Sequence, residues 1–261
     1  MLLYGQTISG TVFEMNTDIT VEYVNIGIIG KNTGTVSDQN GKYTLQIKSE
    51  HLNDTLIFSS IGYHAYSVKI SDFINMNNGN VDLEKRLYDL SEVSISPRKI
   101  KQKVLGSNKK NFLSASYCNN IDFETGILIS NKNTVFIKEA ILNLDLRGHR
   151  ENNDTIFFRF NIYEAHEDMQ FKNILNSPIY VSLPNEDMKD KIVIDLRHQN
   201  LVVEGDFLVS IEKYKNSGLL CFYFPYSRSP NIYTRMSSQG TWSKFQVPGV
   251  ISISVLVDVE K

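Results

Sequence analysis

One segment near the N-terminus constrains the fold of this chain more than any other. Residues 32–45 read NTGTVSDQNGKYTL. Asn40 and Gly41 can supply the positive φ angles that a two-residue turn requires, and the Asp38 side chain can hydrogen-bond to the turn backbone. The segment therefore predicts two strands, 33–36 and 42–47, that form a hairpin around Asn40-Gly41.

The strand pattern continues on both sides of this turn. Tyr43, Leu45 and Ile47 alternate with polar residues, which is typical of a strand with one face in a core. Residues 56–63, LIFSSIGY, read as a buried strand that ends on a glycine. Short strands separated by turns favour a β-sandwich. Between residues 7 and 96 we expect strands at 8–13, 24–29, 33–36, 42–47, 55–60, 66–70, 80–87 and 92–96.

A basic stretch interrupts this pattern. Residues 97–110 contain six lysines and arginines and no acidic residue, with Pro97 and Gly106 as turn formers. We interpret the stretch as a linker between a domain at 6–96 and a second domain at 111–261. Attraction of the basic run to a membrane surface or an acidic partner is the alternative.

Longer strand patterns fill residues 111–261. No segment keeps a helical period for more than two turns, and residues 164–175 are expected to form a loop with one helical turn. We predict an all-β chain of two β-sandwich domains, the second a jelly-roll-like sandwich of two antiparallel sheets. The clearest strands expected in the second domain are 134–147, 155–163, 191–196, 207–213, 219–224 and 250–259.

Five short segments of the first domain carry a family resemblance. They are ISGTV at 8–12, YVNIGI at 23–28, TGTVSD with NGKY at 33–43, LIFSSIGY at 56–63 and LSEVSI at 90–95. Together they resemble the carboxypeptidase-regulatory-like domain, a transthyretin-like Greek-key sandwich of seven strands. Val24 departs from the small residue usual in that family, which affects packing more than fold.

That family is found at the N-terminus of many secreted and outer-membrane proteins of the Bacteroides type, including TonB-dependent receptors. The resemblance covers about the first third of the chain. It implies a fold, a location in the cell envelope and an interaction role. Neither receptor activity nor carboxypeptidase activity is implied by these segments, and the second domain resembles no family that we can name.

The N-terminus and the composition bear on location. Residues 1–5, MLLYG, resemble the end of a secretory signal, so that the mature chain begins near Gln6; a hydrophobic first strand is the alternative. We therefore expect a periplasmic, outer-membrane-associated or secreted protein. The net charge of -2 argues against a nucleic-acid partner. No apolar run approaches the roughly 18 residues of a transmembrane helix.

The two cysteines, Cys118 and Cys221, are too few for a metal site built from paired CxxC motifs. Both lie in apolar strand-like runs. We expect two buried free thiols, as is common for cysteines in such surroundings. A single disulfide between them is the alternative.

No pattern of polar residues specifies a catalytic site. His149 and Asp154 share a polar turn and could form a site, but a solvated hairpin tip is the interpretation that we favour. Asp195, Glu204 and Asp206 could pair as glycosidase acids, yet carboxylates are common at strand ends in sandwiches. We expect no catalytic residues, and a hydrolase with an unrecognised site remains the alternative.

Two groups of oxygen-bearing residues resemble parts of a calcium site. Asp38 and Asn40 lack the bidentate acid that would complete a calcium loop. Asn152, Asn153 and Asp154 offer oxygen ligands in a loop of the second domain. We expect no cofactor or metal, with calcium at 152–154 as the alternative.

Aromatic residues near the C-terminus suggest a binding site. Tyr223, Tyr226, Tyr233 and Trp242 lie close in sequence, with Arg235 among them. Flat aromatic faces beside polar donors suit sugar rings. The alternative is that Tyr223 and Trp242 are core residues while Tyr226 and Tyr233 line a loop.

These features together predict a non-catalytic interaction protein of the cell envelope. Its first domain would serve as a spacer or docking unit, and its second would bind a protein partner or a glycan. A carbohydrate-binding accessory of a polysaccharide-uptake system is the alternative.

Overall fold

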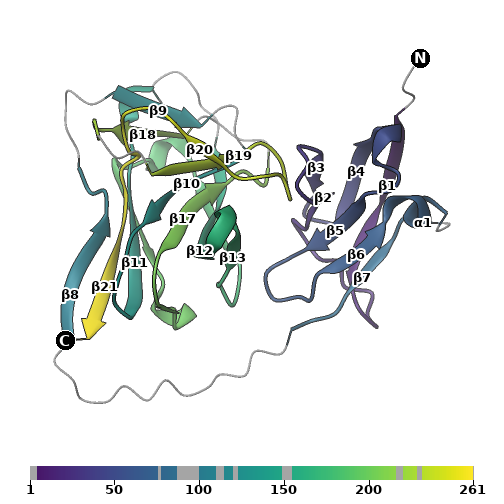
Figure 1. The fold of residues 1–261 in the computed structure, drawn as a ribbon, viewed down its shortest axis with the longest axis horizontal. Coiled ribbons are helices and arrows are strands. Elements are labelled where there is room, and N and C mark those ends of the chain that lie inside the picture. Colours follow the sequence, from purple (N-terminus) through teal and green to yellow (C-terminus); the bar gives the residue numbers. More distant parts are fainter. Residues whose placement is uncertain are drawn as a thin grey trace. The chain divides into compact units, whose positions relative to one another are not determined.

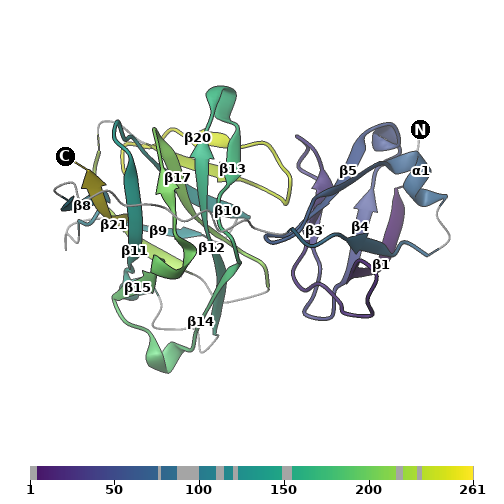
Figure 2. The ribbon, with the colours of Figure 1, turned by 90° about the horizontal axis from the view of Figure 1, so that it is seen from below.

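The computed structural model describes residues 5–75, 78–86, 100–109, 115–119, 123–148, 155–215, 220–227 and 231–260. Strands form most of the regular structure in these ranges (Figures 1 and 2). The chain divides into two compact units, Met1–Tyr88 with Arg235–Thr241 and Asp89–Thr234 with Trp242–Lys261. The predicted all-β class is confirmed.

The first unit is a sandwich of a three-stranded and a four-stranded sheet. The three-stranded sheet has the order β4-β1-β7, in which β1 and β7 are parallel. The four-stranded sheet has the order β3-β2-β5-β6 and is antiparallel. The bounds are β1 Gln6–Glu14, β2 Asn25–Ile28, β3 Gly34–Val36, β4 Lys42–Ile47, η1 Ser49–His51, β5 Thr55–Ser59, β6 Tyr66–Lys69, α1 Ile70–Ile74 and β7 Val81–Leu83.

The facing sides of these two sheets form the core of the first unit. On β4 the expected alternation is present, because every second residue is buried. Phe58 of β5 is fully buried and lies 5.4 Å from the Tyr43 ring and 5.5 Å from the Phe73 ring of α1, measured between centroids. Aromatic contacts therefore join both sheets and the helix around one residue.

The expected hairpin at residues 33–47 is only partly correct. Gly41 has a positive φ, but Asn40 does not. The turn itself forms: Asp38 Oδ1 accepts the backbone N–H groups of Asn40 at 2.8 Å and Lys42 at 2.9 Å. The two flanking strands, however, belong to different sheets, because β3 pairs with β2 and β4 pairs with β1. A tight turn reverses the chain locally, but it does not determine which strands pair with the two segments that flank it.

Gly41 is required at this turn for two separate reasons. Its φ is +72°, and a Cβ built on it would lie 2.6 Å from the Val12 carbonyl oxygen. We expect Gly41→Ala to destabilise the first unit by about 3 kcal/mol, since backbone strain adds to a steric overlap. Hydrogen exchange of the β1 and β4 amides in increasing urea measures the loss.

Gly62→Ala is the matched control for this substitution. Gly62 also has a positive φ, +94°, but nothing lies within 4 Å of the position that a Cβ would occupy there. Gly62→Ala should therefore lower the free energy of unfolding by only about 1–2 kcal/mol, the cost of left-handed backbone strain. Equal losses for the two variants would show that the Val12 contact is unimportant.

The second unit contains two large antiparallel sheets and a two-stranded ribbon. One sheet has the order β13-β12-β17-β10-β19-β20, with β14 also paired to β12. The other has the order β15-β11-β21-β8, with β16 also paired to β11, and the ribbon joins β18 to β9. Long strands that follow one another, such as β10, β11 and β12, alternate between the two sheets, as in a jelly-roll-like sandwich.

The bounds of the elements of the second unit are β8 Ile100–Gly106, β9 Ala115–Asn119, β10 Glu124–Ile129, β11 Val135–Asn143, η2 Leu146–Gly148, β12 Ile156–Ala165, η3 Glu167–Met169, β13 Phe171–Asn173, β14 Ile179–Leu183, η4 Asn185–Asp187, β15 Lys191–Asp195, η5 Arg197–Gln199, β16 Val202–Val203, β17 Phe207–Glu212, β18 Leu220–Phe224, β19 Ile232–Arg235, β20 Ser243–Phe245 and β21 Ile253–Glu260. The expected loop at 164–175 contains the single 3₁₀ turn η3 and also the short strand β13.

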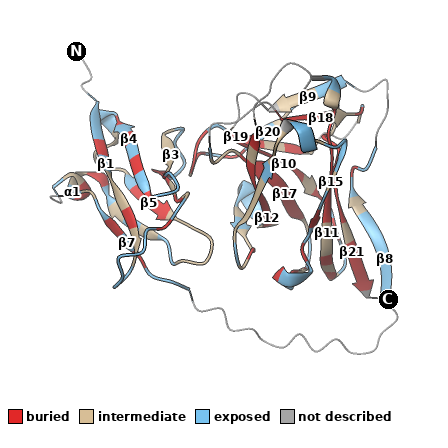
Figure 3. Cartoon of the chain, turned by 180° about the vertical axis from the view of Figure 1, so that it is seen from behind, coloured by how far each residue is buried: buried red, intermediate tan, exposed pale blue. Residues whose placement is uncertain are grey.

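The expected linker at residues 97–110 is wrong for residues 100–106. These residues form β8, which pairs with β21 along its length. Its first five residues are all exposed (Figure 3). Lysines are compatible with such a position because an edge strand has unpaired backbone groups, and charged side chains protect it from pairing with other chains.

The expectation of two free thiols is also wrong. Cys118 of β9 and Cys221 of β18 form a disulfide, and they lie directly opposite each other in the ribbon. The two residues are 103 positions apart in sequence. Local apolar character could not indicate that their strands would be paired.

Candidate ligand-binding cavity

A cavity of about 530 Å³ opens on the second unit. It is bounded by the end of β8 and the residues after it, the end of β10, the segment after β18, and β19 with β20. Strands of both large sheets therefore contribute to it. The lining residues are Leu105, Gly106, Ser107, Asn108, Lys109, Leu128, Ile129, Ser130, Tyr226, Ser227, Asn231, Tyr233, Lys244 and Val250.

Strand pairing places the polar side chains of the cavity. Tyr233 of β19 is directly opposite Lys244 of β20, so both side chains project from the same face of the sheet. Asn231 is held against β10 by two bonds with Leu128: its backbone oxygen accepts the Leu128 N–H at 2.8 Å, and its Nδ2 donates to the Leu128 oxygen at 2.6 Å. These contacts fix one wall of the cavity.

Two polar atoms of the lining lack hydrogen-bond partners among the described residues. They are Ser107 Oγ and Asn231 Oδ1, and both are shielded from solvent. A buried polar atom without a partner costs about 1–3 kcal/mol. Because neither atom is exposed, the polar groups that a bound molecule can reach are on the exposed lining side chains, which include Asn108, Lys109, Tyr226 and Lys244.

Two of the five predicted site residues come together at this cavity. Tyr226 is 69% exposed and Tyr233 is half-buried, and both line it. Trp242 does not: it is buried, with its ring 5.8 Å from that of Tyr163 and 5.3 Å from that of Phe171. Trp242 is therefore a core residue, as the alternative interpretation of the sequence had it.

Tyr223 belongs to a different cluster, beside the disulfide. Asp145 is buried and accepts hydrogen bonds from Arg147 Nε at 2.8 Å, from Arg147 Nη2 at 2.6 Å and from the Ser116 hydroxyl. The hydrogen bond from Arg147 is the main reason that the pKa of Asp145 falls to about 2. The Arg147 guanidinium carbon lies 5.7 Å from the centre of the Tyr223 ring, so Tyr223 packs on a structural ion pair.

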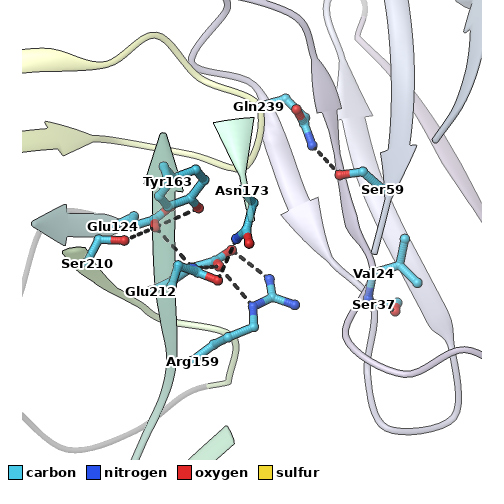
Figure 4. A network of polar contacts seen from close by, with 11 residues as sticks. Val24, Ser37, Ser59, Glu124, Arg159, Tyr163, Asn173, Ser210, Glu212 and Gln239 are labelled. Carbon is cyan, nitrogen blue, oxygen red and sulfur yellow. Dashed lines mark hydrogen bonds and ion pairs between the residues drawn. The ribbon is translucent and has the colours of Figure 1, made fainter. Parts of the chain in front are cut away.

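Arg235 is buried at the end of β19, in the segment Arg235–Thr241 that groups with the first unit. Within that unit, Gln239 Nε2 donates to Ser59 Oγ at 2.7 Å (Figure 4). Arg235 is not among the residues that line the cavity.

A buried polar network, which the sequence did not indicate, crosses the seven-stranded sheet (Figure 4). Arg159 of β12 donates to Glu212 of β17 through Nε at 2.9 Å and Nη2 at 2.7 Å. Asn161 Nδ2 donates to Glu212 at 2.7 Å and to Glu124 of β10 at 3.1 Å, and so connects the two carboxylates. The Tyr163 hydroxyl also donates to Glu124, at 2.9 Å.

The network is structural in character. Arg159, Asn161, Glu124 and Glu212 are at most 1% exposed, so no substrate reaches them in this conformation. The only sequence signal was that Arg159, Asn161 and Tyr163 occupy alternate positions of a strand whose other face is apolar. That pattern normally indicates a solvated face.

The other residues considered for chemistry have local roles or lie outside the described ranges. Asp206 accepts the Asn131 N–H at 2.9 Å, and Glu204 accepts the Thr134 hydroxyl at 3.1 Å. Asp195 pairs with Arg197 at 3.1 Å. The carboxylate of Asp38 is occupied by its turn, as described above. His149 and residues 152–154 are outside the described ranges.

The described residues contain neither a metal-binding cluster nor a membrane-spanning helix. No group of three or more His, Cys, Asp or Glu side chains in these ranges could hold a metal ion. None of the helices in the described part of the chain has the length and apolar character needed to cross a membrane.

Comparisons with solved structures and curated proteins are uninformative. A structure of infectious bursal disease virus, Gt strain, is 9% identical with a TM-score of 0.22, and the match covers 99% of this chain and 60% of that one. A VP2 subviral particle of the same virus has 9% identity, a TM-score of 0.22 and coverages of 99% and 65%. TM-scores this low do not indicate a shared fold. No curated protein matches this chain.

Comparison with protein families is informative for the first unit. The match runs over residues 8–95 and includes the turn at Asp38 and the buried strand β5. The two sheets described above contain the seven strands that the resemblance implied. Residues 8–95 of this chain form a CarboxypepD_reg-like domain.

Proposed function

We propose that this chain is a non-catalytic binding protein of the cell envelope whose second unit binds a saccharide in the cavity beside Tyr226 and Tyr233. The observation that carries the proposal is the composition of that cavity. It combines two tyrosine rings with amide, hydroxyl and ammonium groups. Its volume of about 530 Å³ lies within the range of about 300–1,000 Å³ common for small-ligand sites.

The arrangement suits a sugar better than an apolar ligand. A pyranose ring presents C–H bonds that pack on an aromatic face and hydroxyl groups that need hydrogen-bond partners. Tyr226 is the most exposed large apolar side chain in the described ranges, at 69%. The exposed side chains of Asn108, Lys109 and Lys244, which line the cavity, supply polar groups for ligand hydroxyl groups.

Two features support a location outside the cytoplasm. Disulfides persist in oxidising compartments such as the periplasm and the extracellular space, and Cys118 is bonded to Cys221. The CarboxypepD_reg-like domain resembles modules of secreted and outer-membrane proteins. In this proposal that first domain serves as a spacer or docking unit.

Removal of the exposed ring tests the proposal. We expect Tyr226→Ala to weaken saccharide binding by the full chain about five- to tenfold, since stacking on one aromatic ring contributes on the order of 1–1.5 kcal/mol. A glycan array identifies a binding saccharide, and isothermal titration calorimetry with that saccharide measures the change in Kd.

Two further variants make the result specific. Tyr226→Phe should bind within about twofold of the wild type if the ring face is what matters. Val193→Ala, which shortens another exposed side chain of the second unit, at 49% exposure on β15, should leave Kd unchanged. Absence of binding to every saccharide on the array, or unchanged binding by Tyr226→Ala, would refute the proposal.

A further inference from the structure

The charged residues that line the cavity are all basic. Among the described residues that line the cavity, two are lysines, Lys109 and Lys244, and none is acidic. Both side chains are exposed. The chain as a whole has a net charge of -2, so this local excess of positive charge runs against the overall balance.

The two lysines are brought to the cavity by different sheets. Lys244 lies on β20, opposite Tyr233. Lys109 follows β8, where the Ser107 N–H donates to the Ile253 oxygen at 2.8 Å and the Ser252 hydroxyl donates to the Lys109 oxygen at 2.9 Å. Hydrogen bonds thus hold the backbone at both points, so the positions from which the ammonium groups extend are set by the fold.

No described carboxylate neutralises these lysines. The ion pairs of the second unit occur elsewhere, at Lys138–Asp258, Arg147–Asp145, Arg159–Glu212, His166–Glu164 and Arg197 with Glu139 and Asp195. Lys109 and Lys244 are therefore available to an anionic ligand. An ammonium group attracts a carboxylate or sulfate by charge and offers three hydrogen-bond donors.

We infer that the saccharide bound beside Tyr226 and Tyr233 is acidic, bearing uronate or sulfate groups that Lys109 and Lys244 contact. This inference rests on the proposed function, because it names the class of ligand for the same cavity. The tyrosine ring provides a surface for the sugar, and the lysines discriminate charged from neutral sugars.

Matched pairs of saccharides test the inference with the full chain. Each acidic probe is compared with a neutral counterpart of the same backbone: oligogalacturonate with its methyl ester, and chondroitin sulfate oligosaccharides with chemically desulfated and esterified ones. We expect at least one acidic probe to bind about tenfold or more tightly than its neutral counterpart. Its Kd should rise with ionic strength, because salt screens exposed charges.

Charge-removing variants complete the test. Lys109→Gln and Lys244→Gln should each weaken binding of the acidic probe by about fivefold, the effect of losing one partly exposed ion pair. Lys191→Gln removes the same charge from an exposed position on β15, away from the cavity lining, and should change nothing.

The outcomes separate the two proposals. The acidic-ligand inference would be overturned if acidic and neutral probes bound with equal Kd, or if the lysine variants behaved like Lys191→Gln. In either case, the proposed saccharide function would still stand if Tyr226→Ala raised the Kd. No binding to either member of any pair, and none on the glycan array, would overturn both.

Discussion

Replacing Arg159 by methionine should lower the free energy of unfolding of the second unit by about 3–5 kcal/mol. The substitution leaves Glu212 buried without its guanidinium partner, and breaking one side of a buried ion pair has a cost of this size. Burial by itself lowers the pKa of Arg159, but the charge and hydrogen bonds of Glu212 raise it by more, so the guanidinium stays protonated. Trp242, which is the single tryptophan and is buried in this unit, reports unfolding in urea by fluorescence.

Two further variants show that burial is the cause. The double variant Arg159→Met/Glu212→Leu should recover much of the loss, because apolar side chains of similar volume often replace a buried pair without penalty. Arg197→Met breaks an ion pair with Glu139 at an exposed position and should have little effect. An Arg159→Met variant as stable as Arg197→Met would contradict the structural role given to this network.

Loss of the disulfide should be the second large effect. Cys118→Ser/Cys221→Ser is expected to destabilise the second unit by about 2–5 kcal/mol, because the bond closes a loop spanning 103 residues and restricts the unfolded chain. Trp242 fluorescence in urea again measures the difference. The wild type in excess dithiothreitol should be destabilised by a similar amount.

The reductant also provides the control. Dithiothreitol should not change the stability of the double serine variant, since no thiol remains in a chain with two cysteines. If the wild type were equally stable with and without dithiothreitol, and the variant matched both, the Cys118–Cys221 bond would have no role in holding β9 to β18.

Short-range patterns predicted several of the strands closely. β4 has the predicted bounds of 42–47, and β5 ends one residue earlier than expected. The Asp38 turn formed with the predicted side-chain bonds. These features depend on residues within a few positions of one another, through alternation of apolar side chains and the conformational freedom of Gly41. The family of residues 8–95 was identified from the same local segments.

Strand pairing could not be predicted from these patterns. β3 and β4 are adjacent in sequence but belong to different sheets, while β8, with its lysines, pairs with β21 at the other end of the chain. Periodicity says which face of a strand is apolar, but not which strand lies beside it. For the same reason, periodicity could not show that the polar face of β12 is buried against carboxylates of β10 and β17.

The candidate site shows the same division. The sequence alone determined that this is an all-β chain with a CarboxypepD_reg-like first domain, and it singled out Tyr226 and Tyr233 as candidate binding residues. Only the tertiary structure placed Lys109 and Lys244 beside them. It also showed that Trp242 lies in a core, which the sequence had left open. The reason is physical: strand propensity and turn geometry act over a few residues, whereas a cavity, a disulfide and a buried ion pair join residues that are distant in sequence and meet only when the sheets are assembled.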